Sequence, residues 1–145
     1  MKRIVLAMVM SMSLVAGAAF ARSDLSEPCT THTVQGDYGF SFQGRVFSFV
    51  LGFGPIAAAG TVSSDGEGNL SGSYTESFGG VIRDKQFVGT YTAQANCTIS
   101  VSVMGATVPS TWTAEGKGVI VDGGREVLWV GTDAGAVVSG TVKKQ

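Results

Sequence analysis

The residue of this chain best placed to do chemistry is Glu76, which lies in a segment of alternating apolar and polar residues. Leu70, Tyr74 and Phe78 define the apolar side of residues 70–78, and Glu76 shares that side with them. A carboxylate enclosed among apolar side chains acquires a perturbed pKa and could bind a ligand or act in catalysis. The alternative is a position at the rim of the sheet, because an unpaired buried acid costs free energy. The sequence leaves both positions open.

Four aromatic residues join Glu76 as candidates to line a ligand-binding pocket. They are Tyr74, Tyr91, Trp112 and Trp129. In a small β-barrel, aromatic side chains more often simply fill the interior. The pattern therefore indicates where a ligand would bind, but it names no ligand.

No set of residues in the chain fits a known catalytic site. A Ser-His-Asp unit would have to use His32, the single histidine, which follows Cys29 by three residues in a segment without periodicity. We favour the interpretation of His32 as an exposed side chain without a catalytic role. We assign no catalytic residue. The sequence favours a protein without enzymatic activity, but it does not decide the question.

Six oxygen-bearing side chains have the spacing of a calcium-binding loop. At positions 1, 3, 5, 7, 9 and 12 of such a loop stand Asp65, Glu67, Asn69, Ser71, Ser73 and Glu76. Position 6 requires glycine but is Leu70, and strands rather than helices are expected on both sides. A solvated hairpin tip is the favoured interpretation, and we predict no metal and no other cofactor.

The first residues of the chain have the features of a secretory signal peptide. Lys2 and Arg3 precede an apolar run, and the small residues Ala19 and Ala21 supply a cleavage pattern, which predicts a signal peptide at residues 1–21. The segment looks like a bacterial signal peptide, so we expect the mature protein to be periplasmic or secreted. A membrane anchor is not indicated, because the apolar run ends at a cleavage site.

The two cysteines, Cys29 and Cys97, both follow the predicted cleavage site. An exported chain meets oxidising conditions, in which paired cysteines persist as disulfides. We therefore predict a disulfide between Cys29 and Cys97, with two free buried thiols as the alternative.

The charge of the mature chain limits its partners. Without residues 1–21, eight basic residues oppose eleven acidic ones, a formal net charge of −3. Nucleic acid and anionic lipid both require basic patches, so neither is expected as the main partner. A small apolar ligand or a partner protein is expected instead, and the sequence indicates no oligomeric state.

Residues 36–145 are expected to form a single all-β domain of about eight short antiparallel strands. Asp-Gly pairs that begin at Asp65 and Asp122 supply the positive φ that hairpin turns need. Residues 22–35 are polar, contain Pro28 and show no periodicity, which predicts a coil or disordered segment.

A short motif, Gly-Thr/Ser-Val/Tyr, recurs four times and supports this count of strands. It stands at Gly60-Thr61-Val62, Gly72-Ser73-Tyr74, Gly89-Thr90-Tyr91 and Gly140-Thr141-Val142. An inward glycine permits sharp coiling of a strand, and the residue two positions on fills the interior. The pattern predicts an up-and-down barrel, with a β-sandwich as the alternative.

Residues 45–55 are the segment hardest to assign. Phe47, Phe49 and Phe53 make it strongly apolar, while glycines and Pro55 interrupt it. So much apolar surface would not be left in water, so we expect an irregular lid over one end of the barrel, with Phe47 and Phe49 facing inward. A strand, a helix or an ordinary loop is the alternative.

At these residues the chain resembles a known kind of barrel. Ser-Asp-Gly-x-Gly-Asn-Leu-Ser-Gly-Ser-Tyr at residues 64–74 and Phe-Val-Gly-Thr-Tyr at residues 87–91 look like small calycin-type barrels, namely the allene oxide cyclase-like barrels and the uncharacterised exported bacterial proteins related to them. The resemblance covers residues 37–142 and implies an eight-stranded barrel with an apolar cavity. The lipocalin Gly-x-Trp signature is absent, and no catalytic set of the cyclases can be placed on this chain.

These expectations favour an exported, non-enzymatic β-barrel that binds a small apolar ligand or a partner protein. The first alternative is a barrel enzyme of cyclase or isomerase type that uses Glu76 or a tyrosine. The second is a small outer-membrane barrel, although several expected strands are shorter than a membrane-spanning strand needs.

Overall fold

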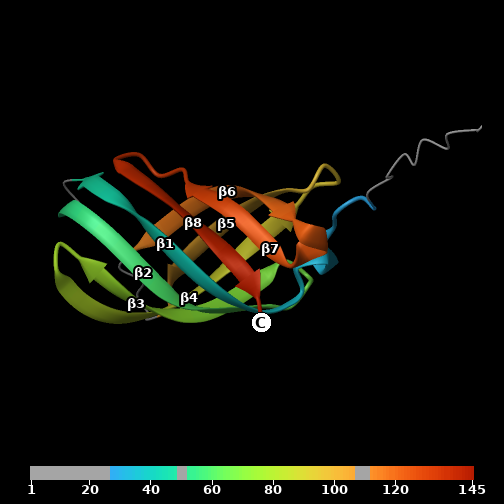
Figure 1. Cartoon of the computed structure of the whole chain (residues 1–145), viewed down its shortest axis with the longest axis horizontal. Coiled ribbons are helices and arrows are strands. Elements are labelled where there is room, and N and C mark those ends of the chain that lie inside the picture. The colour runs from blue at the N-terminus through green and yellow to red at the C-terminus, as the bar shows by residue number, and fades with distance from the viewer. Residues whose placement is uncertain (1–26, 49–51, 107–111) are drawn as a thin grey trace, which may run out of the picture.

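In the computed structural model, which describes residues 27–48, 52–106 and 112–145, eight antiparallel strands close into a barrel (Figure 1). Each strand pairs with its neighbours in sequence, and β8 pairs with β1 to complete the circle. In chain order the elements are η1 (Thr31–Val34), β1 (Gly36–Ser48), β2 (Gly52–Ser64), β3 (Asn69–Phe78), β4 (Val81–Ala93), β5 (Thr98–Gly105), β6 (Thr113–Val121), η2 (Asp122–Gly124), β7 (Glu126–Gly131) and β8 (Ala136–Lys144). The predicted up-and-down barrel is confirmed, and the sandwich alternative is wrong.

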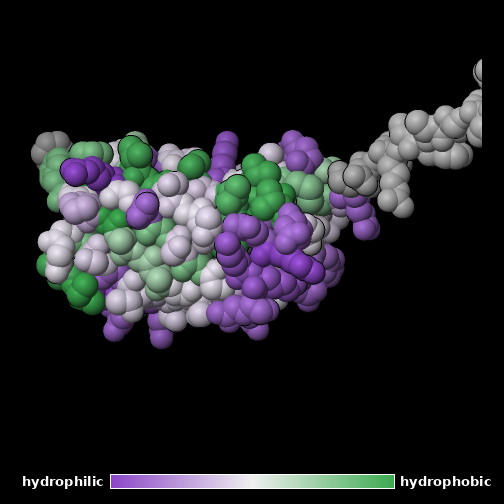
Figure 2. Space-filling view, viewed as in Figure 1, coloured by the Kyte–Doolittle hydropathy of each residue, from purple (hydrophilic) through white to green (hydrophobic). Residues whose placement is uncertain are grey.

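Each strand presents one row of side chains to the interior and the other to solvent, as its alternating sequence requires. On β3, Leu70 and Tyr74 line the interior, while Ser71 and Ser73 are exposed. Figure 2 shows hydrophilic side chains concentrated toward the end where the N-terminal segment enters, with hydrophobic ones in separate patches. The interior row is therefore the place to look for a binding site.

The glycines of the recurring motif lie where adjacent strands approach too closely for a side chain. At Gly60 an added Cβ atom would overlap the carbonyl oxygen of Ser73, and at Gly72 it would overlap that of Thr61. Since these atoms belong to the backbone, they cannot rotate away. The motif thus marks points at which the strands coil tightly around a narrow interior.

One end of the barrel is covered by residues 27–35 of the N-terminal segment (Figure 1). We call these residues the plug and this end of the barrel the plugged end. The predicted disulfide between Cys29 and Cys97 is present, with the two Cα atoms 5.0 Å apart. The short 3-10 helix η1 follows, and its last residue, Val34, is buried in the barrel interior. The hydroxyl of Tyr91 donates a hydrogen bond to the carbonyl oxygen of Thr31 at 3.0 Å. Disulfide, buried valine and hydrogen bond together hold the segment across the opening.

The segment that the sequence assigns to coil therefore contains η1 in its described part, residues 27–35. The hydroxyl of Tyr38 donates to the carbonyl oxygen of Gly124 at 2.8 Å, which joins β1 to η2 beside the plug. The predicted signal peptide at residues 1–21 lies outside the described residues.

The described parts of this segment, residues 45–48 and 52–55, are strand and not the expected irregular lid. β1 continues to Ser48, β2 begins at Gly52, and Phe47 pairs with Phe53 across the hairpin. Val46 takes the inward position and is 6% exposed, so Phe47 must point outward and is 52% exposed. The prediction of an inward Phe47 is wrong, and Phe53 is likewise exposed, at 59%. Phe49 lies outside the described residues.

The turn between β2 and β3 is organised by the carboxylate of Asp65. It accepts hydrogen bonds from the side-chain amide of Asn69 at 2.6 Å, from the backbone N–H of Asn69 at 3.0 Å and from that of Glu67 at 2.7 Å. These bonds, led by that from the Asn69 side chain, lower the pKa of Asp65 from 3.8 to about 2. The Asp-Gly signal in the sequence thus corresponds to a turn built around one carboxylate.

An NMR titration of the Asp65 carboxyl should therefore have its midpoint near 2. Because the folded-state pKa is lowered, the charged turn stabilises the fold above the ordinary value of 3.8, and that stabilisation disappears as the pH falls toward 2. In Asn69→Ala, which lacks the strongest of these hydrogen bonds, the midpoint should rise toward 3.8. A midpoint already at 3.8 in the unmodified protein would contradict this account of the turn.

Candidate ligand-binding cavity

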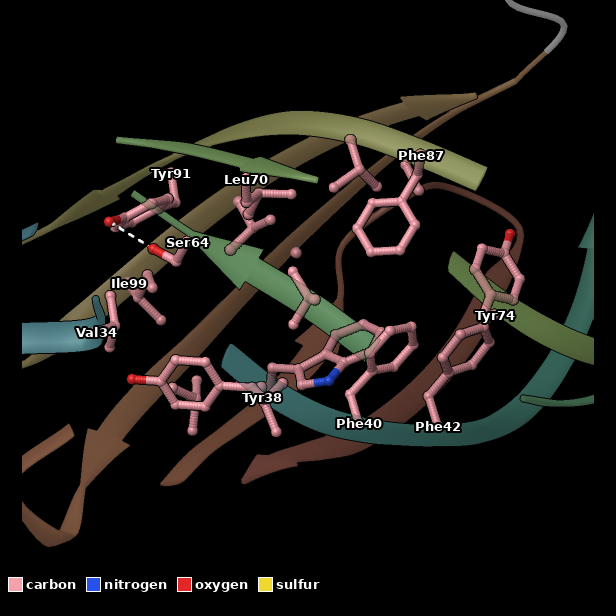
Figure 3. A pocket seen from close by; sticks show the side chains of 18 of the residues that line it. Val34, Tyr38, Phe40, Phe42, Ser64, Leu70, Tyr74, Phe87, Tyr91 and Ile99 are labelled. Carbon is pink, nitrogen blue, oxygen red and sulfur yellow. Dashed lines mark hydrogen bonds between the residues drawn. The ribbon is translucent and has the colours of Figure 1, made fainter. Parts of the chain in front are cut away.

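The barrel interior contains a cavity of about 210 Å³ next to the plugged end (Figure 3). Val34 closes the cavity on the plug side, and Phe40, Phe42 and Phe87 contribute rings to its walls. The lining is almost wholly apolar, as expected for a cavity that admits hydrocarbon more readily than water.

The sequence predicts five ligand-binding residues, and four of them lie on the wall of this cavity. They are Tyr74, Tyr91, Trp112 and Trp129. They come from β3, β4, the residue before β6, and β7, so the barrel closure brings them together from distant parts of the chain. The fifth candidate, Glu76, does not line the cavity.

An aromatic belt surrounds the cavity on the side away from the plug. We use this name for Phe40, Phe42, Tyr74, Phe87, Trp112 and Trp129. Ring centroids lie 5.7 Å apart for Phe42 and Trp129 and 6.2 Å apart for Tyr74 and Trp112, in edge-to-face arrangements. No large side chain among the described residues falls below 2% exposure. The aromatics therefore surround a space and do not fill the interior completely.

The polar groups at the plugged side of the cavity are occupied by one another. Ser64 donates its hydroxyl hydrogen to the Tyr91 oxygen at 2.8 Å, the dashed line in Figure 3, and Tyr91 donates to Thr31. Burial, with a smaller contribution from Tyr91, raises the pKa of Tyr38 beside them. This side of the cavity disfavours a charged group.

Glu76 is buried on the inward row of β3, two residues before the strand ends, and it is paired with basic side chains. Its residue exposure is 3%, and Lys85 Nζ lies 2.9 Å from Glu76 Oε1. Arg83 Nη1 lies 3.8 Å from the same oxygen. We call Glu76, Arg83 and Lys85 the charged cluster.

The charged cluster touches the aromatic belt. Lys85 Nζ lies 5.5 Å from the centroid of a Trp112 ring, within the range of a cation–π contact. Burial, and then the nearby charge of Glu76, raise the pKa of Tyr74 well above its usual value. The phenol of Tyr74 is therefore neutral at physiological pH.

Arg83 and Lys85 were not singled out from the sequence, although a signal for them exists. They precede Phe87 at a spacing of two, so the alternation of β4 places all three on the inward row. Two cations on an inward row need an anion nearby, and Glu76 on the neighbouring strand supplies it.

The other sequence candidates do not come together in the structure. Glu76 points inward while Ser71 and Ser73 point to solvent, and Asp65 is engaged in its turn, so the six oxygen-bearing side chains do not converge. Across residues 27–48, 52–106 and 112–145, no three acidic, histidine or cysteine side chains are grouped as a metal site would require. His32 is exposed in η1.

Two further observations bear on the class of protein. Within the described residues, no helix has the length and apolar character needed to cross a membrane. Comparison with protein-family models, with curated proteins and with solved structures found no match. The functional assignment therefore rests on the cavity and its surroundings.

Proposed function

We propose that this protein is an exported, non-enzymatic barrel that binds a small apolar ligand in its cavity. The single observation that carries the proposal is the apolar cavity of about 210 Å³, lined by the aromatic belt and by Val34 of the plug. Apolar cavities with few polar groups in their walls are the usual sites of small apolar ligands. Export is supported by the predicted signal peptide together with the disulfide, which persists in oxidising compartments.

The alternatives have less support. For a cyclase or isomerase, Glu76 is the candidate acid or base, but it is engaged by Lys85 and lies off the cavity wall. For an outer-membrane barrel, the outward rows would have to form an apolar band around the whole barrel. The outward row of β7 is apolar at Leu128 and Val130, but that of β3 reads Ser71, Ser73, Thr75, so the band is not continuous. The calycin-type resemblance agrees with the barrel and the cavity, and the proposal does not depend on it.

Both tryptophans of the chain line the cavity, which supplies an internal reporter of binding. Titration with decan-1-ol, an uncharged single-chain probe, should change the intrinsic fluorescence of Trp112 and Trp129 saturably. A linear, non-saturating response would count against a defined site.

Filling the cavity should abolish this response. Val101 lines the cavity, so Val101→Phe should weaken binding of decan-1-ol by roughly tenfold or more, because the added ring occupies the space of the probe. Val88→Phe is the matched control, since Val88 is on the outward row of β4 and 43% exposed. Equal binding by the two variants would contradict the proposal.

A further inference from the structure

The charged cluster lies directly beside the proposed ligand site. Lys85 pairs across the strands with Tyr74, a wall residue of the cavity, and Glu76 pairs with Arg83 one step further from the plug. Together with the contact between Lys85 and Trp112, this pairing places two basic groups next to wall residues of the apolar cavity.

The cluster has more positive than negative charge. One carboxylate, Glu76, faces two cations, which leaves a formal charge of +1 at neutral pH. The carboxylate is nearly buried, with 4% of its side chain exposed, while 52% of the Arg83 side chain and 28% of the Lys85 side chain are exposed. The accessible part of the cluster is therefore cationic.

The contact geometry leaves hydrogen-bonding capacity on the basic side chains. Lys85 approaches Glu76 within hydrogen-bond distance, but Arg83 at 3.8 Å is beyond it, so this contact is an ion pair only. A guanidinium has five N–H donors and binds planar carboxylates in a bidentate manner. A second carboxylate would find matching donors here.

A cationic ligand is the competing interpretation, because aromatic rings beside a buried carboxylate can bind ammonium groups. In this barrel the carboxylate already has two cationic partners, and Lys85 itself occupies a position over the Trp112 ring. A ligand cation would have to displace one of them and would meet the repulsion of the other.

We infer that the ligand is an amphiphile whose anionic, carboxylate-type head binds Lys85 and Arg83 while its apolar part lies in the cavity. This inference rests on the proposed function and adds the chemical class of the ligand. The orientation follows from the surroundings of the cavity: its plugged side disfavours charge, whereas the basic groups lie behind its wall on the other side, where Lys85 pairs with Tyr74 and contacts Trp112.

Three probes with the same hydrocarbon chain test the inference on the full mature protein: decanoate, decan-1-ol and decyltrimethylammonium. Measured by tryptophan fluorescence at neutral pH, decanoate should bind about tenfold more tightly than decan-1-ol, the effect of one charge-assisted hydrogen bond. Decyltrimethylammonium should bind more weakly than decan-1-ol.

Variants locate the head group. Arg83→Gln should weaken decanoate binding by about tenfold and leave decan-1-ol binding unchanged. Lys117→Gln is the matched control, because Lys117 is an exposed cation on the outward row of β6. Glu76→Gln should strengthen decanoate binding, since it removes the competing carboxylate. A merely structural ion pair predicts no gain in affinity for this variant.

The outcomes separate this inference from the proposed function. If decanoate and decan-1-ol bind equally, or if decyltrimethylammonium binds most tightly, the anionic head is overturned and the apolar site stands. If none of the three probes binds, both proposals fail. Decanoate binding that is equally strong in Arg83→Gln and the unmodified protein would also overturn the inference, because Arg83 is the most accessible of the donors.

Discussion

Replacing Cys29 and Cys97 together with serine should lower the free energy of unfolding by about 2–5 kcal/mol. The disulfide joins positions 68 residues apart in sequence, and a loop of that length gains roughly 4 kcal/mol on the chain-entropy model. It also ties the N-terminal segment to the barrel, where Val34 is 5% exposed and closes one side of the cavity. Urea denaturation monitored by fluorescence measures the loss.

The reduced, unmodified protein is the control for the serine side chains themselves. It should lose the same stability as the double variant, and a thiol reagent should label both cysteines only after reduction. Midpoints in urea that are equal with and without reductant would contradict a stabilising role for the disulfide.

The second large effect is expected at η2, where two adjacent glycines provide a matched pair. Gly123 and Gly124 both have positive φ, at 62° and 89°, so alanine at either position costs about 1–2 kcal/mol in the backbone. A Cβ atom at Gly124 would in addition overlap the carbonyl oxygen of Thr33 in η1, whereas at Gly123 it would meet no atom within 4 Å.

Gly124→Ala should therefore destabilise the protein by about 1–3 kcal/mol more than Gly123→Ala, the usual cost of overpacking. Because the overlapping oxygen belongs to Thr33 in η1, Gly124→Ala should displace η1 from the cavity. The variant should therefore also weaken decan-1-ol binding. Urea midpoints of the two variants provide the measurement. Equal losses would mean that η1 moves aside without cost and does not close the barrel.

The barrel itself could be predicted from the sequence because its determinants are local. The period-two alternation of β3 reports which row is buried, and the Asp-Gly pair at Asp65 requires a tight turn. The motif glycines at Gly60 and Gly72 are detectable because no other residue fits where backbones nearly touch. The cysteine pairing could be predicted because the chain has only two.

The candidate site was predictable in part. Tyr74, Tyr91, Trp112 and Trp129 follow the inward pattern, and the structure places all four on one cavity wall. Whether they would fill the interior or surround a space depends on how eight strands close, and the alternation within one strand carries no information about that volume.

Local patterns did not determine the closure of the ends or the partners of Glu76. The apolar segment at Phe47 suggested a lid, but the pairing of β1 with β2 assigns Phe47 to the outward row, and the polar N-terminal segment covers an end instead. Likewise Lys85 meets Glu76 because β3 and β4 pair in one register. The sequence by itself determined the strands, turns and disulfide through short-range constraints. The tertiary structure decided the plug, the cavity and the charged cluster, because these arise from contacts between rows of different strands.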